Sequence, residues 1–221
     1  MRPRLIAFDY DGTLAEDGII RPATVAALAD AKRAGFRLAI VTGRPHDELL
    51  ALCPDLGLFD LVVDENGAVL YFPATGAVED LGPAPPPQFA AELARREVRF
   101  SLGRVVVRTW RPHLEAAHEA IRALDLALDV IPNKYAVMIV PRGTDKGTGL
   151  EAGLRRLGVE PAETMAVGDD ENDRAVFRVA ALRVAVANAV ESLKAEADRV
   201  MSRPCGQGVV ELLRDPLLAS S

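Results

Sequence analysis

The stretch Asp9-Tyr10-Asp11-Gly12-Thr13 places two carboxylates directly after the apolar run 5–8. Such a run is typical of a buried parallel strand, and open α/β sheets bind their ligands beyond the carboxyl ends of the strands. Two aspartates two residues apart on extended chain point to the same side, where they repel unless a cation lies between them. Oxygen ligands of this kind suit Mg²⁺. An Asp-Gly turn that merely ends a strand is the alternative interpretation.

A hydroxyl occupies the corresponding place after the next apolar run, 36–41, where Thr42 and Gly43 precede a helix predicted to reach about residue 52. A hydroxyl beside a helix N-terminus can donate to a phosphate oxygen, together with backbone N–H groups. Capping of that helix by Thr42 explains the same residues. The position is therefore a candidate phosphate site with a structural alternative.

Two charged groups late in the chain point to the same chemistry. Lys146 stands at a predicted helix start, where a cation opposes the helix dipole unless an anion lies nearby; an exposed loop lysine is the alternative. The run 168–173 (Gly-Asp-Asp-Glu-Asn-Asp) places four acids within six positions. These acids need a compensating cation, or they fan out into water at a helix start.

The elements that must position these residues alternate along the chain. Apolar runs predict strands at 5–8, 36–41, 61–63, 164–167 and 182–186. Helices are predicted at 22–35, after Lys146 and at 189–197. Asn66-Gly67 predicts a hairpin into a further run at 68–72. We therefore expect an α/β fold, a doubly wound, Rossmann-like parallel sheet, which brings Asp9, Thr42, Lys146 and Asp169 to one edge.

A break in composition at 82–87 (Gly-Pro-Ala-Pro-Pro-Pro) separates a second module from this core. Beyond it the pattern predicts helices at 88–97 and 112–124 and strands at 104–109, 126–130 and 135–140. We expect a small inserted α+β domain. The predicted division is core at 1–81, inserted domain at 82–140 and core again at 141–221.

The four motifs resemble, in order, those of the haloacid dehalogenase superfamily of phosphohydrolases, and the resemblance covers the whole chain. They are Asp9-x-Asp11-Gly-Thr, Thr42-Gly-Arg, Pro141-x-Gly-x-x-Lys146-Gly and Gly168-Asp-x-x-Asn-Asp173. The inserted module is similar to the type IIB cap of the Cof-like, sucrose-phosphatase and archaeal phosphoglycolate-phosphatase groups.

The resemblance implies a role for each motif residue. Asp9 is the nucleophile that forms an aspartyl-phosphate, and Asp11 is the general acid and base. The implied phosphate-binding residues are Thr42, Gly43, Lys146 and Asn172. The implied Mg²⁺ ligands are Asp9, Asp11 through its backbone carbonyl, Asp169 and Asp173.

The implied function is Mg²⁺-dependent hydrolysis of a small phosphorylated metabolite, phosphoglycolate or a sugar phosphate. A phosphomutase or other phosphotransferase of the same superfamily is the first alternative, and a module that only binds Mg²⁺ and accepts a phosphoryl group is the second. Cap residues could meet a carboxylate or second anionic group of the substrate, although solvated surface charge is the commoner role. These cap candidates are Arg108, Arg111, His113 and Lys134.

Composition excludes several other classes. A net charge of −6 gives no basic field for nucleic acid. No apolar run approaches the ~18 residues that span a bilayer, and the N-terminal apolar run is too short for a signal peptide. Cys53 and Cys205 fit no disulfide framework or metal motif. We expect a cytoplasmic monomer or homodimer that binds neither nucleic acid nor membranes.

Overall fold

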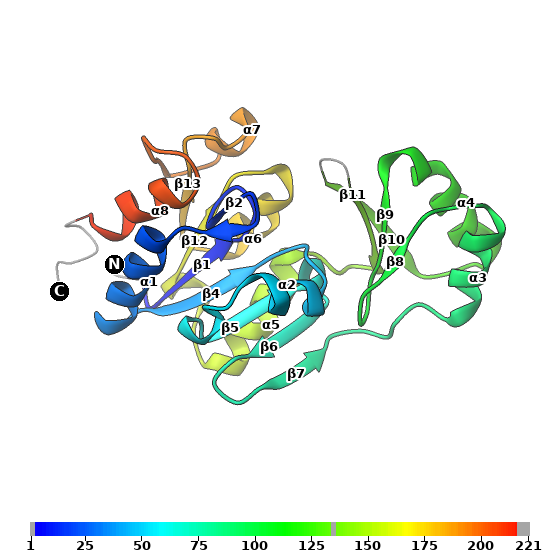
Figure 1. The fold of residues 1–221 in the computed structure, drawn as a ribbon, viewed down its shortest axis with the longest axis horizontal. Helices are drawn as coiled ribbons and strands as arrows, with labels where there is room; N and C mark the ends of the chain where they lie inside the picture. The colour runs from blue at the N-terminus through cyan, green and yellow to red at the C-terminus, as the bar shows by residue number, and fades with distance from the viewer. Residues whose placement is uncertain (1–2, 134–135, 216–221) are drawn as a thin grey trace.

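The computed structural model describes residues 3–133 and 136–215, which form two sheets with helices packed on them (Figure 1). The larger sheet has eight strands in the order β14-β13-β12-β1-β4-β5-β6-β7. Neighbouring strands from β14 to β5 are parallel, whereas β6 and β7 continue the sheet antiparallel. Their bounds are β14 Arg199–Val200, β13 Leu182–Ala185, β12 Thr164–Gly168, β1 Leu5–Asp9, β4 Arg37–Val41, β5 Leu61–Asp64, β6 Val69–Phe72 and β7 Ala77–Asp80.

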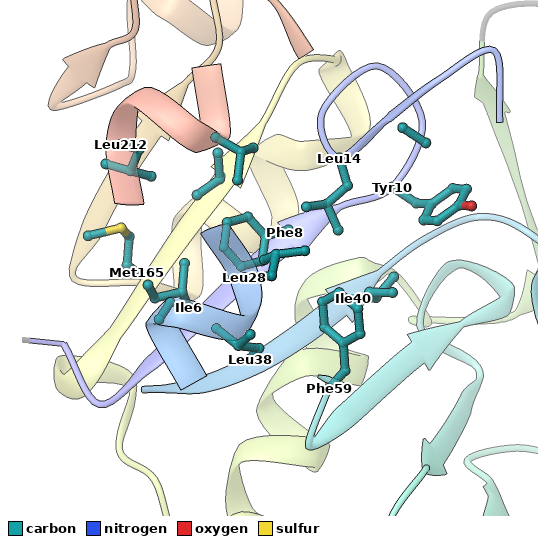
Figure 2. Close-up of a cluster of buried hydrophobic side chains, with 14 of the residues drawn as sticks. Ile6, Phe8, Tyr10, Leu14, Leu28, Leu38, Ile40, Phe59, Met165 and Leu212 are labelled. Carbon is teal, nitrogen blue, oxygen red and sulfur yellow. The ribbon is translucent and has the colours of Figure 1, made fainter. Parts of the chain in front are cut away.

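Helices cover both faces of this sheet, because its central strands are apolar on both sides. In β1, Ile6 and Phe8 face one apolar cluster, which includes residues of α1, α2 and α8 (Figure 2). Leu5 and Ala7 face the other, with residues of α5, α6 and α7. The helices are α1 Pro22–Arg33, α2 His46–Leu52, α5 Lys146–Leu157, α6 Arg174–Val179, α7 Glu191–Lys194 and α8 Cys205–Leu213. The expected doubly wound α/β fold is confirmed.

The second sheet, with two helices, forms a smaller body beside the first (Figure 1), and we call the elements from α3 to β11 the cap. Its antiparallel order is β10-β11-β9-β8. Phe89, Leu93 and Ile121 of the helices pack on Val107 and Ile139 of the sheet. The cap elements are α3 Pro87–Arg95, β8 Ser101–Leu102, β9 Val107–Trp110, α4 Leu114–Ala123, β10 Leu128–Asn133 and β11 Ala136–Pro141.

A small apolar cluster joins the cap to the core. Core residues Ala68 and Val69 pack against Val105 and Val106, which lie between β8 and β9, and against Val140 of β11. Because Val105 and Val106 are each only 1% exposed, the tip of the β8–β9 hairpin is a buried joint. The cap is therefore fixed to the core at a defined point as well as through the chain connections.

The structure adds elements that the sequence pattern did not predict. The segment 14–21 contains a short hairpin of β2 (Ala15–Glu16) and β3 (Ile19–Ile20), whose turn residues Asp17 and Gly18 have positive φ. β7, β8 and β14 were also not predicted, because short, partly exposed strands carry no continuous apolar run. The helix expected at 189–197 is only Glu191–Lys194.

Short 3₁₀ turns complete the chain: Leu56–Leu58, Glu65–Gly67, Arg111–His113, Pro161–Glu163 and Glu171–Asp173. Within 3–133 and 136–215, no helix combines the length and the apolar character needed to cross a bilayer.

Candidate active site

Four motif residues meet at the carboxyl edge of the larger sheet. Asp9 ends β1, Thr42 follows β4, Asp169 follows β12, and Lys146 is the first residue of α5. All four are buried. The exposed-lysine alternative for Lys146 is therefore wrong, and so is helix capping by Thr42, because the N-cap residue of α2 is Pro45.

The carboxylates of Asp9, Asp169 and Asp173 form an acidic triad whose possible ligand atoms lie within 4.8 Å of one another. The Lys146 ammonium lies among them, and its Nζ donates to Asp9 Oδ1 at 2.6 Å and to Asp173 Oδ1 at 2.7 Å. These contacts explain how a cation is tolerated at the N-terminus of α5, where the helix dipole opposes it.

Three buried carboxylates face one ammonium, so the triad carries excess negative charge. Burial, reinforced by Asp173, raises the pKa of Asp9 well above its usual value, and Lys146 opposes the shift. Burial alone would lower the pKa of Lys146, but Asp173 and Asp9 outweigh it and raise that pKa. Oxygen-only donors with uncompensated charge fit a hard metal ion, which would neutralise the excess.

Other residues of the motifs hold the triad in place. Thr13 Oγ1 donates to Asp169 Oδ1 at 3.1 Å. Asp173 Oδ2 accepts the backbone N–H groups of Asp169 and Asp170 at 2.9 and 3.0 Å. Gly12 has φ +86°, and a Cβ there would lie 2.4 Å from Asp169 Oδ2, so only glycine lets the two motifs approach this closely.

Asp11 has a different partner from the triad. Arg44 donates to both of its carboxylate oxygens at 2.7 Å, from Nε and from Nη2. We expected Asp9 and Asp11 to share one side of an extended segment, but β1 ends at Asp9 and the chain turns before Asp11. Asp11 and Asp9 line the same cavity, with their carboxylates held by different cations.

A second charged network runs from Asp11 to the cap, and we call it the bridging network. Arg44 Nη1 donates to Glu48 Oε1 at 2.6 Å, and Arg108 of the cap donates from Nη1 to Glu48 Oε2 at 2.8 Å. Asp11, Arg44, Glu48 and Arg108 thus alternate in charge from core to cap. Sequence reasoning assigned no role to Arg44 or Glu48, although their i,i+4 spacing allows an ion pair on a helix start.

A cavity of about 180 Å³ lies between core and cap, below the roughly 300–1,000 Å³ of most ligand pockets. Its lining combines both networks with two apolar cap residues. It is lined by Asp9, Asp11, Thr42, Gly43, Arg44, Glu48, Arg108, Ala136, Met138, Lys146, Asp170 and Asn172. Four carboxylates and three cationic side chains are among these residues, so a small anionic ligand fits this space together with a bound metal ion.

The cap candidates separate in the structure. Arg108 lines this cavity, whereas Arg111 and His113 line another hollow of about 390 Å³ with Trp110. Lys134 lies outside the described residues.

Among the phosphate-site candidates, Thr42 Oγ1 accepts the N–H of Arg44 at 3.1 Å. Gly43 and Asn172 line the cavity.

An acidic triad and a buried lysine at the edge of a doubly wound sheet, under a cap, define an α/β enzyme built for an anionic substrate. The sequence model of the haloacid dehalogenase-like hydrolases matches residues 6–80 and 105–213, and the chain belongs to this family. Family membership and the acidic triad together imply a metal ion.

Similar proteins cover the chain almost completely. The phosphoglycolate phosphatase of Methanothermobacter thermautotrophicus is 34% identical over 96% of this chain and 97% of its own. That of Haloarcula marismortui is 35% identical over 95% of each chain. A Thermoplasma acidophilum crystal structure has a TM-score of 0.84, at 21% identity, covering 97% and 98% of the two chains.

A sugar phosphatase of HAD subclass IIB shares the fold with a TM-score of 0.77, at 22% identity, covering 96% of this chain and 98% of its own. The expected membership of the haloacid dehalogenase family is confirmed, and archaeal phosphoglycolate phosphatases are among the similar proteins, as expected.

Proposed function

We propose that the protein is a Mg²⁺-dependent phosphatase of phosphoglycolate, or of a similarly small phosphomonoester with a second anionic group. One observation carries this proposal: the cavity has a buried lysine and carboxylates at its core side and the guanidinium of Arg108 at its cap side. The phosphoglycolate phosphatases similar to this chain support the substrate. The fold alone does not select it, because a sugar phosphatase shares that fold.

The proposed reaction starts with attack of an Asp9 carboxylate oxygen on phosphorus, while the bond from phosphorus to the ester oxygen breaks. Asp11 gives a proton to the departing oxygen. Water then attacks the aspartyl-phosphate, Asp11 takes the proton of that water, and Asp9 is released with inorganic phosphate. Transfer of a dianionic group requires mainly charge neutralisation and in-line positioning.

The remaining motif residues hold the phosphoryl group. The oxygens of the phosphoryl group would be bound by four residues that line the cavity beside Asp9: Lys146, Thr42, Gly43 and Asn172. Asp9, Asp169 and the Asp11 backbone carbonyl would hold Mg²⁺, which when bound supplies charge neutralisation between nucleophile and phosphate. Both oxygens of Asp173 accept hydrogen bonds, so we propose that Asp173 serves the metal site chiefly by fixing Lys146 and the 169–170 backbone.

Arg108 would bind the second anionic group of the substrate, with Arg44 beside it. Both guanidiniums donate to the Glu48 carboxylate, and this arrangement supports binding of a substrate carboxylate that takes the place of Glu48. The other cap candidates were Arg111, His113 and Lys134, and the position of Arg111 and His113 in a different hollow favours Arg108.

The organisation of the chain follows the same proposal. Residues 1–81 and 141–221 would form the core and 82–140 the cap, which agrees with cap elements that run from Pro87 to Pro141. We propose a cytoplasmic monomer or homodimer, because two cysteines are too few for the disulfide framework typical of small secreted proteins. Light scattering would measure the oligomeric state.

Phosphate release from a panel of phosphomonoesters tests the function. The panel contains phosphoglycolate, hexose phosphates, nucleotides and pyridoxal phosphate, each with Mg²⁺ or with EDTA. We expect Mg²⁺-dependent release, highest for phosphoglycolate, that is lost in Asp9→Asn. Release that persists in EDTA would contradict the metal requirement. No release from any ester unless an acceptor alcohol is added would instead indicate a phosphotransferase.

A further inference from the structure

Glu65 is a buried carboxylate in the core that accepts hydrogen bonds from backbone N–H groups of the cap. It lies just after β5, and its side chain is shielded from solvent. Oε1 accepts the N–H of Arg104 at 2.7 Å, and Oε2 accepts those of Val105 and Val106 at 2.8 and 3.0 Å. One side chain therefore holds three consecutive amides of the β8–β9 hairpin.

The hairpin tip requires such an acceptor. Gly103 donates to the Val106 carbonyl at 2.8 Å, which closes a tight turn whose own amides point inward. Val105 and Val106 are buried, and a buried amide without an acceptor is costly. A converging set of backbone N–H groups binds an anion well, and the Glu65 carboxylate supplies that anion.

Glycine at position 103 makes room for this contact. A Cβ at Gly103 would lie 2.5 Å from Glu65 Oε1. Its φ is not in the left-handed region, so the close approach of the carboxylate is what disfavours a side chain there. Glu65 itself has φ +50°, a conformation that few non-glycine residues adopt. The contact therefore depends on the missing side chain at position 103 and on the unusual backbone conformation of Glu65.

The backbone of the turn that contains Glu65 also holds the loop with the phosphate-site residue Thr42. The Glu65 N–H donates to the Arg44 carbonyl at 3.0 Å, and the Asn66 N–H donates to the Thr42 carbonyl at 2.9 Å. On the other side, the hairpin tip leads directly into β9, which carries Arg108. Glu65 thus connects the loop that positions Thr42 and Arg44 with the strand that positions Arg108.

We propose that Glu65 is a positioning residue for substrate selection, which fixes the cap arginine Arg108 at a set distance from the phosphate-binding loop. Glu65 contacts no reacting atom. It determines where the second anionic group of a substrate must lie when its phosphate is bound. The activity part of this inference rests on the proposed function, whereas the contact itself does not.

The activity test compares phosphoglycolate with ethyl phosphate, which lacks the carboxylate. Glu65→Gln replaces one accepting oxygen by an amide donor. We expect it to lower kcat/KM for phosphoglycolate about tenfold or more, mainly through KM, and to change that for ethyl phosphate less than about threefold. Gly103→Ala should do the same from the cap side, without altering the core turn. A merely structural role would lower both activities equally, which would overturn the proposal.

Glu97→Gln is the matched control, because Glu97 also has positive φ (+56°) but is exposed and lies in the cap away from this contact. It should leave both activities unchanged.

Amide hydrogen exchange supplies a readout that needs no turnover. Glu65→Gln should accelerate exchange at residues 104–106 about tenfold or more relative to Glu97→Gln, with residues 107–109 of β9 much less affected. Unchanged exchange at 104–106 would overturn the contact, even if the wild type proved inactive on phosphoglycolate. Faster exchange with an unaltered substrate preference in an active enzyme would overturn the role in selection.

Discussion

The acidic triad with Lys146 and the bridging network from Asp11 to Arg108 both contain ion pairs, yet they differ in burial and in charge balance. The Lys146 side chain is 2% exposed, against 20% for Arg44 and 27% for Arg108. The triad has three carboxylates and one ammonium, which donates to Asp9 and Asp173, whereas the bridging network pairs two carboxylates with two guanidiniums. The first lies within the core, and the second spans two bodies of the molecule.

This difference separates two tasks. An unbalanced, buried site attracts a metal ion, because charge brought there is poorly screened, and the metal ion together with Lys146 would then attract the transferring phosphoryl group. A balanced, partly exposed network contributes little to stability but can exchange one carboxylate for another. The core site should therefore control the rate of the chemistry, and the bridging network should control which substrate is held.

The largest effect is expected from Lys146→Met. It leaves Asp9 and Asp173 buried without their shared cation, which should cost about 3–5 kcal/mol of unfolding free energy. Phosphate release should fall about 10³-fold or more because a stabilising charge beside the reacting group is lost. Urea unfolding and phosphate release measure both.

Lys32→Met is the control for that variant, because it removes a lysine from a partly exposed pair with Asp60. Its activity should be unchanged. If Lys146→Met kept its activity within tenfold of wild type, the triad would not be the site of chemistry.

Arg108→Gln tests the bridging network. We expect KM for phosphoglycolate to rise about tenfold to a hundredfold with kcat nearly unchanged, because a charged partner of the substrate is lost outside the reacting centre. Ethyl phosphate should be hydrolysed as before. Arg111→Gln, in the separate hollow of the cap, is the matched control and should leave KM for phosphoglycolate as it is. If both substitutions raised KM for phosphoglycolate equally, Arg108 would not be the residue that binds the second anionic group of the substrate.

His46 and Asp64 form a buried pair apart from the acidic triad and the bridging network. This pair should affect the stability of the fold and not the phosphatase reaction. Their side chains meet at 2.6 Å, both buried. The hydrogen bond to Asp64 raises the pKa of His46, and burial raises the pKa of Asp64 to about 6. The folded protein therefore binds protons more tightly than the unfolded chain at both groups.

Stability from this pair is present at low pH and declines as pH rises through the folded pKa values. We expect a loss of about 1–2 kcal/mol in unfolding free energy between pH 5 and about pH 8, and a flatter profile in Asp64→Asn. Chemical unfolding at a series of pH values measures it. A wild-type profile that rises over this range relative to Asp64→Asn would show that the sign is wrong.

Asp80→Asn should have the smallest effect. Asp80 pairs with Arg104 of the hairpin tip at 2.8 Å, and both side chains are about two-fifths exposed. Loss of such a pair should cost less than about 1 kcal/mol and change KM less than about twofold. A larger change in KM would mean that the exposed pair, and not the buried Glu65 contact, sets the position of the cap.

The sequence predicted most of the core and little of what joins it to the cap. β1, β4 and β12 are mainly apolar, and a motif residue ends or directly follows each strand, so local pattern was sufficient. β7, β8 and β14 are short and partly exposed, and their pairing depends on neighbours distant in sequence. Val190 and Leu193 matched a longer helix than the Glu191–Lys194 that forms.

The same limit applies to the site. The residues of the triad stand inside recognisable motifs, but Glu48 and Glu65 gain their roles from contacts 60 and about 40 residues away. Glu65 reads locally as part of an Asn-Gly hairpin turn, and its cap partners are backbone amides, which every residue but proline possesses. Only the packed position of the cap identifies these two residues.

Asp9 is proposed to accept the phosphoryl group, and Asp11 to act first as general acid and then as general base. Asp11→Asn can neither protonate a leaving oxygen nor take the proton from water, so an aspartyl-phosphate should accumulate from a substrate whose leaving group needs no proton, such as p-nitrophenyl phosphate. The variant would be mixed with p-nitrophenyl phosphate and Mg²⁺, quenched in acid, reduced with borohydride, digested and examined by mass spectrometry. We expect reduction of Asp9 to homoserine only in samples given substrate. An unmodified Asp9, or a phosphoryl group on another residue, would contradict it.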